Sequence, residues 1–338
     1  MGNQNPVPWR DLTDPRRAGD ISELEKGLKE PEFENLEIPE DLGTVRVTVD
    51  DHKIKRYAFT HDDYSPWHFG QSPFGGRVGH AGLLGNDLVQ LFTLVYAGSK
   101  VVGYHTEEQM WFDSPVSLDE VVTLAGTYTE AYERRGEGYV VMEARATGED
   151  GRSIVRHRGV EILKTNPGAV GGRGSAEPSR RVTGEVPEGA RVVDTLGKDV
   201  APGDALAPLH KTITAEQAAV FSRIGEYVRN IHNDIDVARS GGLSVPIVQG
   251  QQQFGVLAEL LTLRSGPSFL TSGWLRVKFL APLDVFEPFT ARGVVTAVTP
   301  AEDGIRVDME IWVRRDSDAR LMTAGWAAVT VPAQPAPS

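Results

Sequence analysis

The chain repeats itself, because residues of one half return in the other half at a constant separation. Five residues recur 167 positions later with their type unchanged. They are Pro115, Thr123, Gly126, Met142 and Glu143, which return as Pro282, Thr290, Gly293, Met309 and Glu310. Five coincidences at one offset are improbable in unrelated segments, so we infer an internal duplication. The fold must therefore be one that two copies of a single unit can build.

Each copy combines strand-like segments with one long apolar stretch. In the first copy, Val45, Val47 and Val49 alternate as in a short strand, and residues 54–58 follow at helical spacing. Residues 78–97 carry leucines that fit one face of a long, mostly buried helix. Further strands are expected over residues 109–112, 121–132, 139–146 and 153–162. The pattern predicts an α+β architecture in which each antiparallel sheet wraps a central helix.

The duplication also divides the chain. Residues 1–43 show little periodicity and are expected to form an extended arm before the first unit, residues 44–163. Residues 164–204 hold two Gly-rich clusters, four prolines and few large apolar side chains, as expected of a linker. The second unit then occupies residues 205–332. Sheets of this kind leave open edges, so we expect the two-unit chain to form a homodimer.

Composition limits the cellular setting. The 338 residues include no cysteine, which excludes a disulfide framework, and they carry a formal net charge of -12. A nucleic-acid partner would require a basic face, so none is expected. The first residues lack the pattern of a signal peptide, and no apolar run is long enough to span a bilayer. The sequence predicts a soluble, cytoplasmic protein with no membrane partner.

One turn-rich segment carries candidate chemistry. It places Asp63 and His68 five residues apart, with a Gly-rich stretch after them. A carboxylate and an imidazole at this spacing are suited to acid-base catalysis. The alternative is structural, because an Asp in such a turn often caps a helix and a His can simply pack in the core.

The second half supplies a more extended pattern. It reads Asn230-Ile231-His232-x-Asp234, then Ala238, Gly242-Leu243, Pro246-Ile247-Val248 and Gln249-Gly250. This resembles the MaoC-like, (R)-specific enoyl-CoA hydratase branch of the hotdog superfamily, whose motif runs Asp-x-Asn-Pro-x-His-x-Asp, then Ala, Gly-Phe, Pro-Ile and His-Gly. The resemblance covers both halves and implies two tandem hotdog units.

The resemblance also implies an activity. In that family an Asp and a His hold the water that adds to the double bond of an acyl thioester, or remove water in reverse. A glycine-flanked helix N-terminus supplies a backbone N–H to the thioester oxygen, where charge develops. The chain is thus expected to be a hydro-lyase acting on an acyl-CoA or acyl-carrier-protein substrate. Neither a metal nor an organic cofactor is expected.

The two halves depart from the family motif in complementary ways. The first half keeps Asp63 and His68, whereas the second has Tyr227 at the Asp position and Gln249 in place of the family's second His. We therefore assign Asp63 and His68 as the working pair. His232 is a further catalytic candidate, a substrate-positioning remnant or a core histidine. The substrate-binding candidates are His80, Gly82, Tyr227, Asn230, Gln249 and Gly250.

Two other functions remain open. A hotdog thioesterase needs a carboxylate on or facing the central helix, and Asp87 and Glu259 are available, although the motif spacing favours the hydratase. The incomplete motif in each half also permits a protein that binds acyl thioesters without catalysis.

Overall fold

The computed structural model describes residues 25–101, 103–163, 181–222 and 229–332. In the first half, the strands and α-helices are β1 (Glu40–Val49), α2 (Asp51–His61), α3 (Pro66–Phe69), α4 (Gly85–Val89), β2 (Gly103–Phe112), β3 (Glu120–Arg134), β4 (Glu137–Gly148) and β5 (Ser153–Leu163). The second half has β6 (Val192–Val193), β7 (Ala205–Leu206), β8 (Leu209–Lys211), α5 (Ala215–Phe221), α6 (Ile235–Ser240), β9 (Ile247–Val248), α7 (Gly250–Ser265), α8 (Phe269–Ser272), β10 (Trp274–Phe279), β11 (Leu283–Asp284), β12 (Phe289–Ala301), β13 (Gly304–Arg315) and β14 (Leu321–Pro332). Among these described helices, none is long and apolar enough to cross a bilayer.

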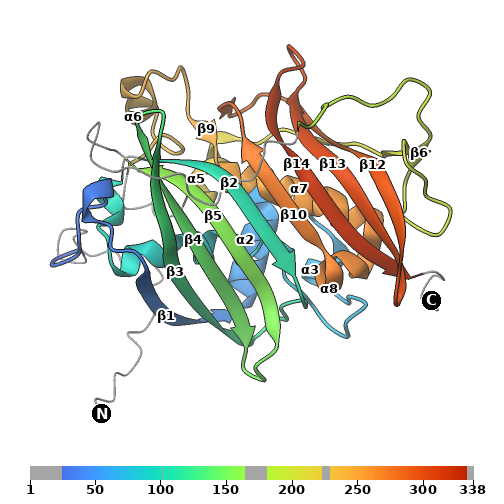
Figure 1. The fold of residues 1–338 in the computed structure, drawn as a ribbon, viewed down its shortest axis with the longest axis horizontal. Coiled ribbons are helices and arrows are strands. Elements are labelled where there is room, and N and C mark those ends of the chain that lie inside the picture. The colour runs from blue at the N-terminus through green and yellow to red at the C-terminus, as the bar shows by residue number, and fades with distance from the viewer. Residues whose placement is uncertain (1–24, 102, 164–180, 223–228, 333–338) are drawn as a thin grey trace.

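One broad sheet runs through both halves. Its strands follow the order β1-β3-β4-β5-β2-β10-β14-β13-β12-β7-β6, with β8 pairing on β12. The halves meet where β2 pairs antiparallel with β10, from Trp111 opposite Trp274 to Glu107 opposite Lys278. In Figure 1 the strands lie in front, and α2 and α7 lie behind them. The predicted side-by-side arrangement of two sheets, each wrapped on helices, is confirmed.

Strand register confirms the duplication. Gly126 lies opposite Ala144 in the first half, and Gly293 lies opposite Ile311 in the second. Met142 opposite Tyr128 and Met309 opposite Val295 form an equivalent couple. The register also shifts at the same point of both hairpins, directly after Tyr128 in the first and directly after Val295 in the second. A shared irregularity at one offset is what two copies of a unit should retain.

The central helices differ between the halves. In the second half, α7 is 16 residues long and almost entirely buried. The long helix predicted for residues 78–97 is wrong, because the first half has only the five-residue α4, a 3-10 helix over Gln90–Leu94 and turns before them. Glycines are frequent at this place: a Cβ on Gly79, Gly82 or Gly85 would lie 2.5 Å from a neighbouring side chain. Such glycines weaken a helix.

The borders of the first unit also differ slightly from the prediction. β1 begins at Glu40, so the strand starts inside the expected arm, while α2 follows the predicted helical spacing. Part of the expected linker, residues 164–180, lies outside the described residues. Its later part packs on the second half, where Val182, Val186 and Ala190 contact the cluster around Trp312.

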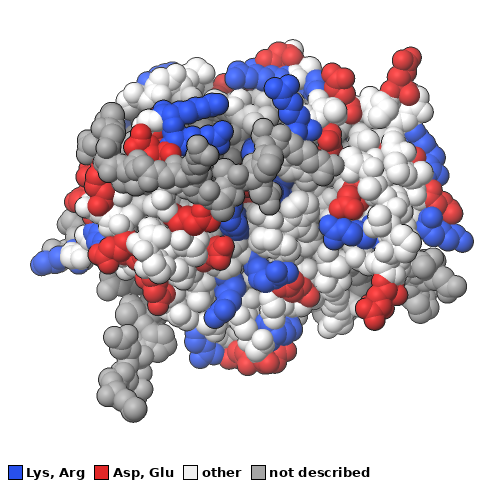
Figure 2. All heavy atoms as spheres, viewed as in Figure 1, with Lys and Arg blue, Asp and Glu red and all other residues white. Residues whose placement is uncertain are grey.

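The outer face of the sheet carries charges of both signs. Figure 2 shows basic and acidic side chains interspersed over it. Several of them pair, including Arg156 with Asp113 and Arg306 with Asp308.

Candidate active site

Asp63 is aimed inward by the way α2 ends. Asp62 adopts a left-handed conformation, with φ of 52°, as the C-cap, and the N–H of Asp63 then bonds Ala58 O at 2.9 Å. This turn closes the helix and directs the next side chain into the protein. Asp63 is consequently only 6% exposed, although it follows an exposed residue.

His68 lies on the short helix α3, which Ser65 caps and Pro66 starts. Its Nε2 lies 3.0 Å from Asp63 Oδ2, and its Nδ1 lies 2.9 Å from the carbonyl oxygen of Val78. A carbonyl only accepts, so Nδ1 carries a proton, and the bond to an ionised Asp63 places a second proton on Nε2. The sequence-predicted pair is therefore in direct contact, as carboxylate and imidazolium.

The charges of this pair support one another. Burial disfavours the charged form of Asp63, but the hydrogen bond from His68 and the nearby imidazoles outweigh it and hold the pKa of the carboxyl well below its usual range. Burial likewise opposes the charge on His68, yet the bond to Asp63 raises the pKa of the imidazole above its ordinary value. Asp63 is thus a weak base whose main effect is to keep His68 protonated.

His80 brings a second imidazole to Asp63. The backbone N–H of Gly82 donates to His80 Nδ1 at 2.9 Å, so this nitrogen is unprotonated. Burial lowers the pKa of His80 well below its ordinary value, and the neutral ring therefore carries its proton on Nε2. That N–H lies 3.7 Å from Asp63 Oδ2 and has no hydrogen-bond partner among the described residues.

Gly82 is required by close packing at the same place. A Cβ there would lie 2.5 Å from the hydroxyl oxygen of Tyr57 and 3.5 Å from the Cα of Gly255 on α7. The Tyr57 ring stacks on His61, with centroids 4.2 Å apart, and tilts toward His80 at 4.9 Å. These rings form the wall between the pair and the central helix of the second half.

The second half contributes two charged groups to this wall. Lys211, at the end of β8, donates to the carbonyls of His61 and Asp62 at 2.9 and 2.8 Å. Its ammonium also lies 2.8 Å from Glu259 Oε1 on α7. Glu259 is 6% exposed, and its other oxygen, Oε2, has no partner among the described residues.

The surroundings of Glu259 shift the pKa of its carboxyl strongly upward. Burial and the negative charge of Asp63 outweigh the attraction of Lys211 and raise the pKa of Glu259 to about 8. Oxygen or nitrogen atoms of Asp63, His80 and Glu259 all lie within 4.8 Å of one another, close enough to share a metal ion by distance alone. The Lys211 ammonium already supplies positive charge to Glu259, which disfavours a cation there.

The second half repeats the hydrogen bond that anchors His68, but no carboxylate partner is found among its described residues. His232 Nδ1 lies 2.8 Å from Ile247 O, just as His68 Nδ1 lies beside Val78 O. No described carboxylate pairs with it, and burial lowers the pKa of His232 to about 4. Asn230 accepts the His232 backbone N–H at 2.9 Å, and Asp234 caps α6. Tyr227, the remaining candidate here, lies outside the described residues.

Gln249 and Gly250 do begin α7, as the sequence predicted. Glu259 follows Gly250 by nine residues, which is about 13 Å along a helix axis. A Cβ on Gly250 would lie 2.9 Å from the Phe279 ring. Of the two glycine positions, Gly82 is therefore the one beside Asp63.

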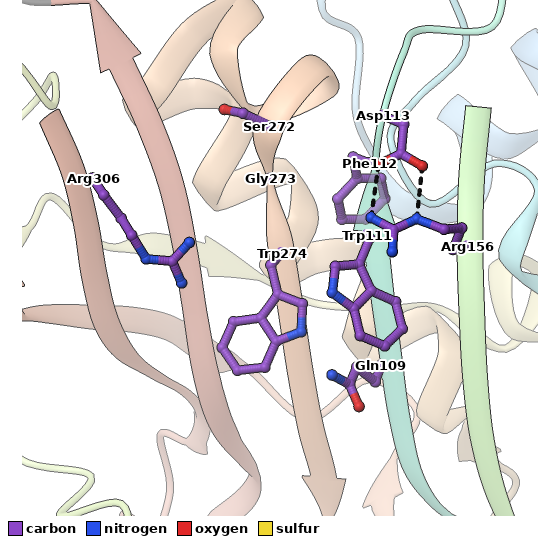
Figure 3. Close-up of a pocket in the computed structure, with 9 residues that line it drawn as sticks. All are labelled: Gln109, Trp111, Phe112, Asp113, Arg156, Ser272, Gly273, Trp274 and Arg306. Carbon is purple, nitrogen blue, oxygen red and sulfur yellow. Dashed lines mark hydrogen bonds and ion pairs between the residues drawn. The ribbon is translucent and has the colours of Figure 1, made fainter. Parts of the chain in front are cut away.

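A separate pocket of about 430 Å³ opens at the junction of β2 and β10. Figure 3 shows Trp111 and Trp274 side by side in it, with Arg156 held by Asp113. Met110 and Phe112 are buried toward the helices, so Trp111 between them faces the opposite side of the sheet. This pocket and the Asp63 cluster thus lie on different faces.

Sequence reasoning missed Tyr57, His61 and Lys211. Only the fold brings Lys211 to Asp63, since more than a hundred residues separate them. Tyr57 and His61 lie just before Asp63 on α2, and their ring contacts with one another and with His80 appear only in the structure. For Glu259 a signal existed, because this charge interrupts the apolar run from Phe254 to Leu261.

We compared the chain with family models, curated proteins and solved structures. No family model matches the sequence, and no curated protein matches it. Among solved structures, a MaoC-like dehydratase superposes with a TM-score of 0.67 at 17% identity, covering 91% of this chain and 99% of its own. A MaoC-like dehydratase from Phytophthora capsici gives 0.62 at 15%, covering 87% and 96%.

A third structure is described by its fold. A conserved hypothetical protein from Mycobacterium tuberculosis with a double hotdog fold gives a TM-score of 0.60 at 14% identity, covering 89% of this chain and 98% of that protein. These similarities span nearly the whole length of each relative. The chain therefore has the double-hotdog fold that is found in MaoC-like dehydratases.

Proposed function

We propose that the protein is a hydro-lyase that adds water to the double bond of an enoyl thioester, or removes it from a 3-hydroxyacyl thioester. The observation that carries the proposal is the Asp63–His68 ion pair at 3.0 Å, buried in a double-hotdog fold. Its substrate would be carried on coenzyme A or on an acyl-carrier protein.

The chemistry requires two proton exchanges. In hydration, a water loses a proton as its oxygen bonds C3, and C2 gains a proton as the double-bond electrons form the new C–H bond. The buried pair is suited to this work, because its carboxylate holds His68 in the protonated form that can donate to C2. The reverse steps remove water.

The thioester oxygen needs a donor while the enolate forms. We assign this role to the turn at Gly82, which lies beside the pair, in preference to the start of α7. The Gly82 N–H now bonds His80 Nδ1, so a thioester oxygen would take over that hydrogen bond. A fixed backbone N–H at this point stabilises developing negative charge.

The test separates three classes of function. The purified protein is mixed with a crotonyl-type thioester, and both the conjugated enoyl absorbance and free thiol are followed. A hydratase lowers the absorbance without releasing thiol, whereas a thioesterase releases thiol. A protein that only binds would change neither signal while retaining the ligand in equilibrium dialysis, and that result would overturn the proposal.

A further inference from the structure

Glu259 is a buried carboxyl that the Asp63–His68 pair leaves unexplained. It projects from the middle of α7, the central helix of the other half, into the space beside Asp63. One of its oxygens is bound by Lys211, whereas Oε2 has no partner among the described residues. An unsatisfied polar atom in a buried position costs free energy, so it marks a place that a ligand or water should fill.

Polar groups of three side chains, His80, Asp63 and Glu259, lie close together beside the Glu259 oxygen that has no partner among the described residues. His80 Nε2–H offers a donor and the Asp63 and Glu259 carboxylates offer acceptors, and one nitrogen or oxygen atom of each side chain lies within 4.8 Å of the other two. A water here would accept one hydrogen bond from His80 and donate one to each carboxylate. Its remaining lone pair would be free to attack carbon. The three side chains thus offer one donor and two acceptors, which is the set that would hold and orient a nucleophilic water.

We propose that Glu259 is the catalytic residue that exchanges a proton with this water, and that the Asp63–His68 pair exchanges the second proton with C2. In hydration, an O–H bond of water breaks, its proton moves to Glu259 Oε2, and the oxygen bonds C3. The double-bond electrons take a proton from His68 at C2. A proton returned from Glu259 to His68 restores the enzyme. This inference rests on the proposed hydratase activity.

The charges around Glu259 favour this division of roles. Asp63 faces it from the loop after α2, His68 from α3, His80 from the turn before α4 and Lys211 from β8. Tyr57 on α2 is also close enough to feel its charge, and His61 stacks on Tyr57. Burial and Asp63 raise the pKa of Glu259 to about 8, near the working pH that suits a general base, whereas Asp63 is far more acidic. Lys211 stabilises the Glu259 carboxylate before it takes the proton.

The experiment compares Glu259→Gln with the wild type across pH. In the wild type, kcat/KM for hydration should rise with pH through about 8, as Glu259 loses its proton. Glu259→Gln should lose this rising limb and reduce kcat by about 10²-fold with little change in KM. Asp87→Asn is the matched control, because Asp87 is also a helix carboxylate paired with a lysine, at 2.7 Å from Lys53. It should keep both the rate and the pH profile.

A second readout does not depend on turnover. Infrared difference spectra of wild type minus Glu259→Gln at pH 6.5 should contain the carbonyl band of a protonated carboxyl, which disappears above pH 9. Circular dichroism tests whether the Glu259→Gln variant is folded. If Glu259→Gln is unfolded, the same measurements are made on Glu259→Asp. A wild-type rate and profile in the Glu259 variant, or no protonated-carboxyl band, would overturn the inference alone. Absence of hydration by the wild type would instead overturn the proposed function, and the inference with it.

Discussion

Replacing Asp63 by asparagine removes one negative charge from the buried pair and leaves the shape of the side chain intact. The amide oxygen of the Asp63→Asn variant can still accept the Ser65 N–H that Asp63 Oδ1 now accepts at 3.0 Å. The amide cannot hold His68 as a cation, because the ionised partner of His68 Nε2 is gone.

The size of the effect follows from that lost bond. A hydrogen bond to a charged group contributes about 1.5–3 kcal/mol, which corresponds to a decrease of about one to two units in the pKa of His68. Burial already opposes the imidazolium, so the proton donor for C2 becomes scarce at neutral pH. Together with the loss of a hydrogen bond to the reacting water, we expect kcat/KM to fall by about 10²- to 10⁴-fold.

The assay is the decrease of enoyl absorbance for a crotonyl-type thioester at several pH values. The falling limb of the wild-type profile, where His68 loses its proton, should move to lower pH in Asp63→Asn. Circular dichroism should be unchanged. A folded Asp63→Asn protein with a near-normal rate and an unmoved profile would refute the assignment of this pair.

Three further outcomes are expected. His232→Ala should mainly raise KM, because His232 has no described carboxylate partner; a folded but inactive variant would move the chemistry to the second half. Gly82→Ala should abolish hydration, since its Cβ would meet Tyr57 at 2.5 Å, whereas Gly250→Ala should lower thermal stability more than kcat; equal loss of kcat would contradict this assignment. Nitrogen NMR at pH 6.5 should find His68 protonated and His61, His80 and His232 neutral, since burial lowers the pKa of these three; a neutral His68 would contradict the ion pair.

The parts of the fold that depend on a local residue pattern or on the internal repeat could be predicted from the sequence. The offset that relates Gly126 to Gly293 predicted two equivalent hairpins, and their shared register shift confirms it. The spacing of Asp63 and His68 led us to assign them as a pair, and the structure places them in contact because only a short segment joins them. For residues this close along the chain, the spacing in the sequence largely determines the distance between the side chains.

Other features depended on contacts between distant segments. Leucine periodicity predicted a long helix over residues 78–97, but Gly82 and Gly85 pack against Tyr57 and Met110, which only the fold brings near. Lys211 belongs to the second half but donates to a carbonyl at the end of α2 in the first half. A lone lysine on a three-residue strand gives no indication in the sequence of this contact. The contribution of Lys211 to the site was therefore not visible in the motif comparison.

A structure with a bound 3-hydroxyacyl thioester tests the location of the chemistry most directly. We predict that the substrate hydroxyl oxygen lies within hydrogen-bonding distance of both Asp63 and Glu259, with His80 Nε2 donating to it. The thioester oxygen should face the Gly82 N–H. A ligand seated beside His232, or in the pocket between Trp111 and Trp274, would contradict a working site at the Asp63–His68 pair.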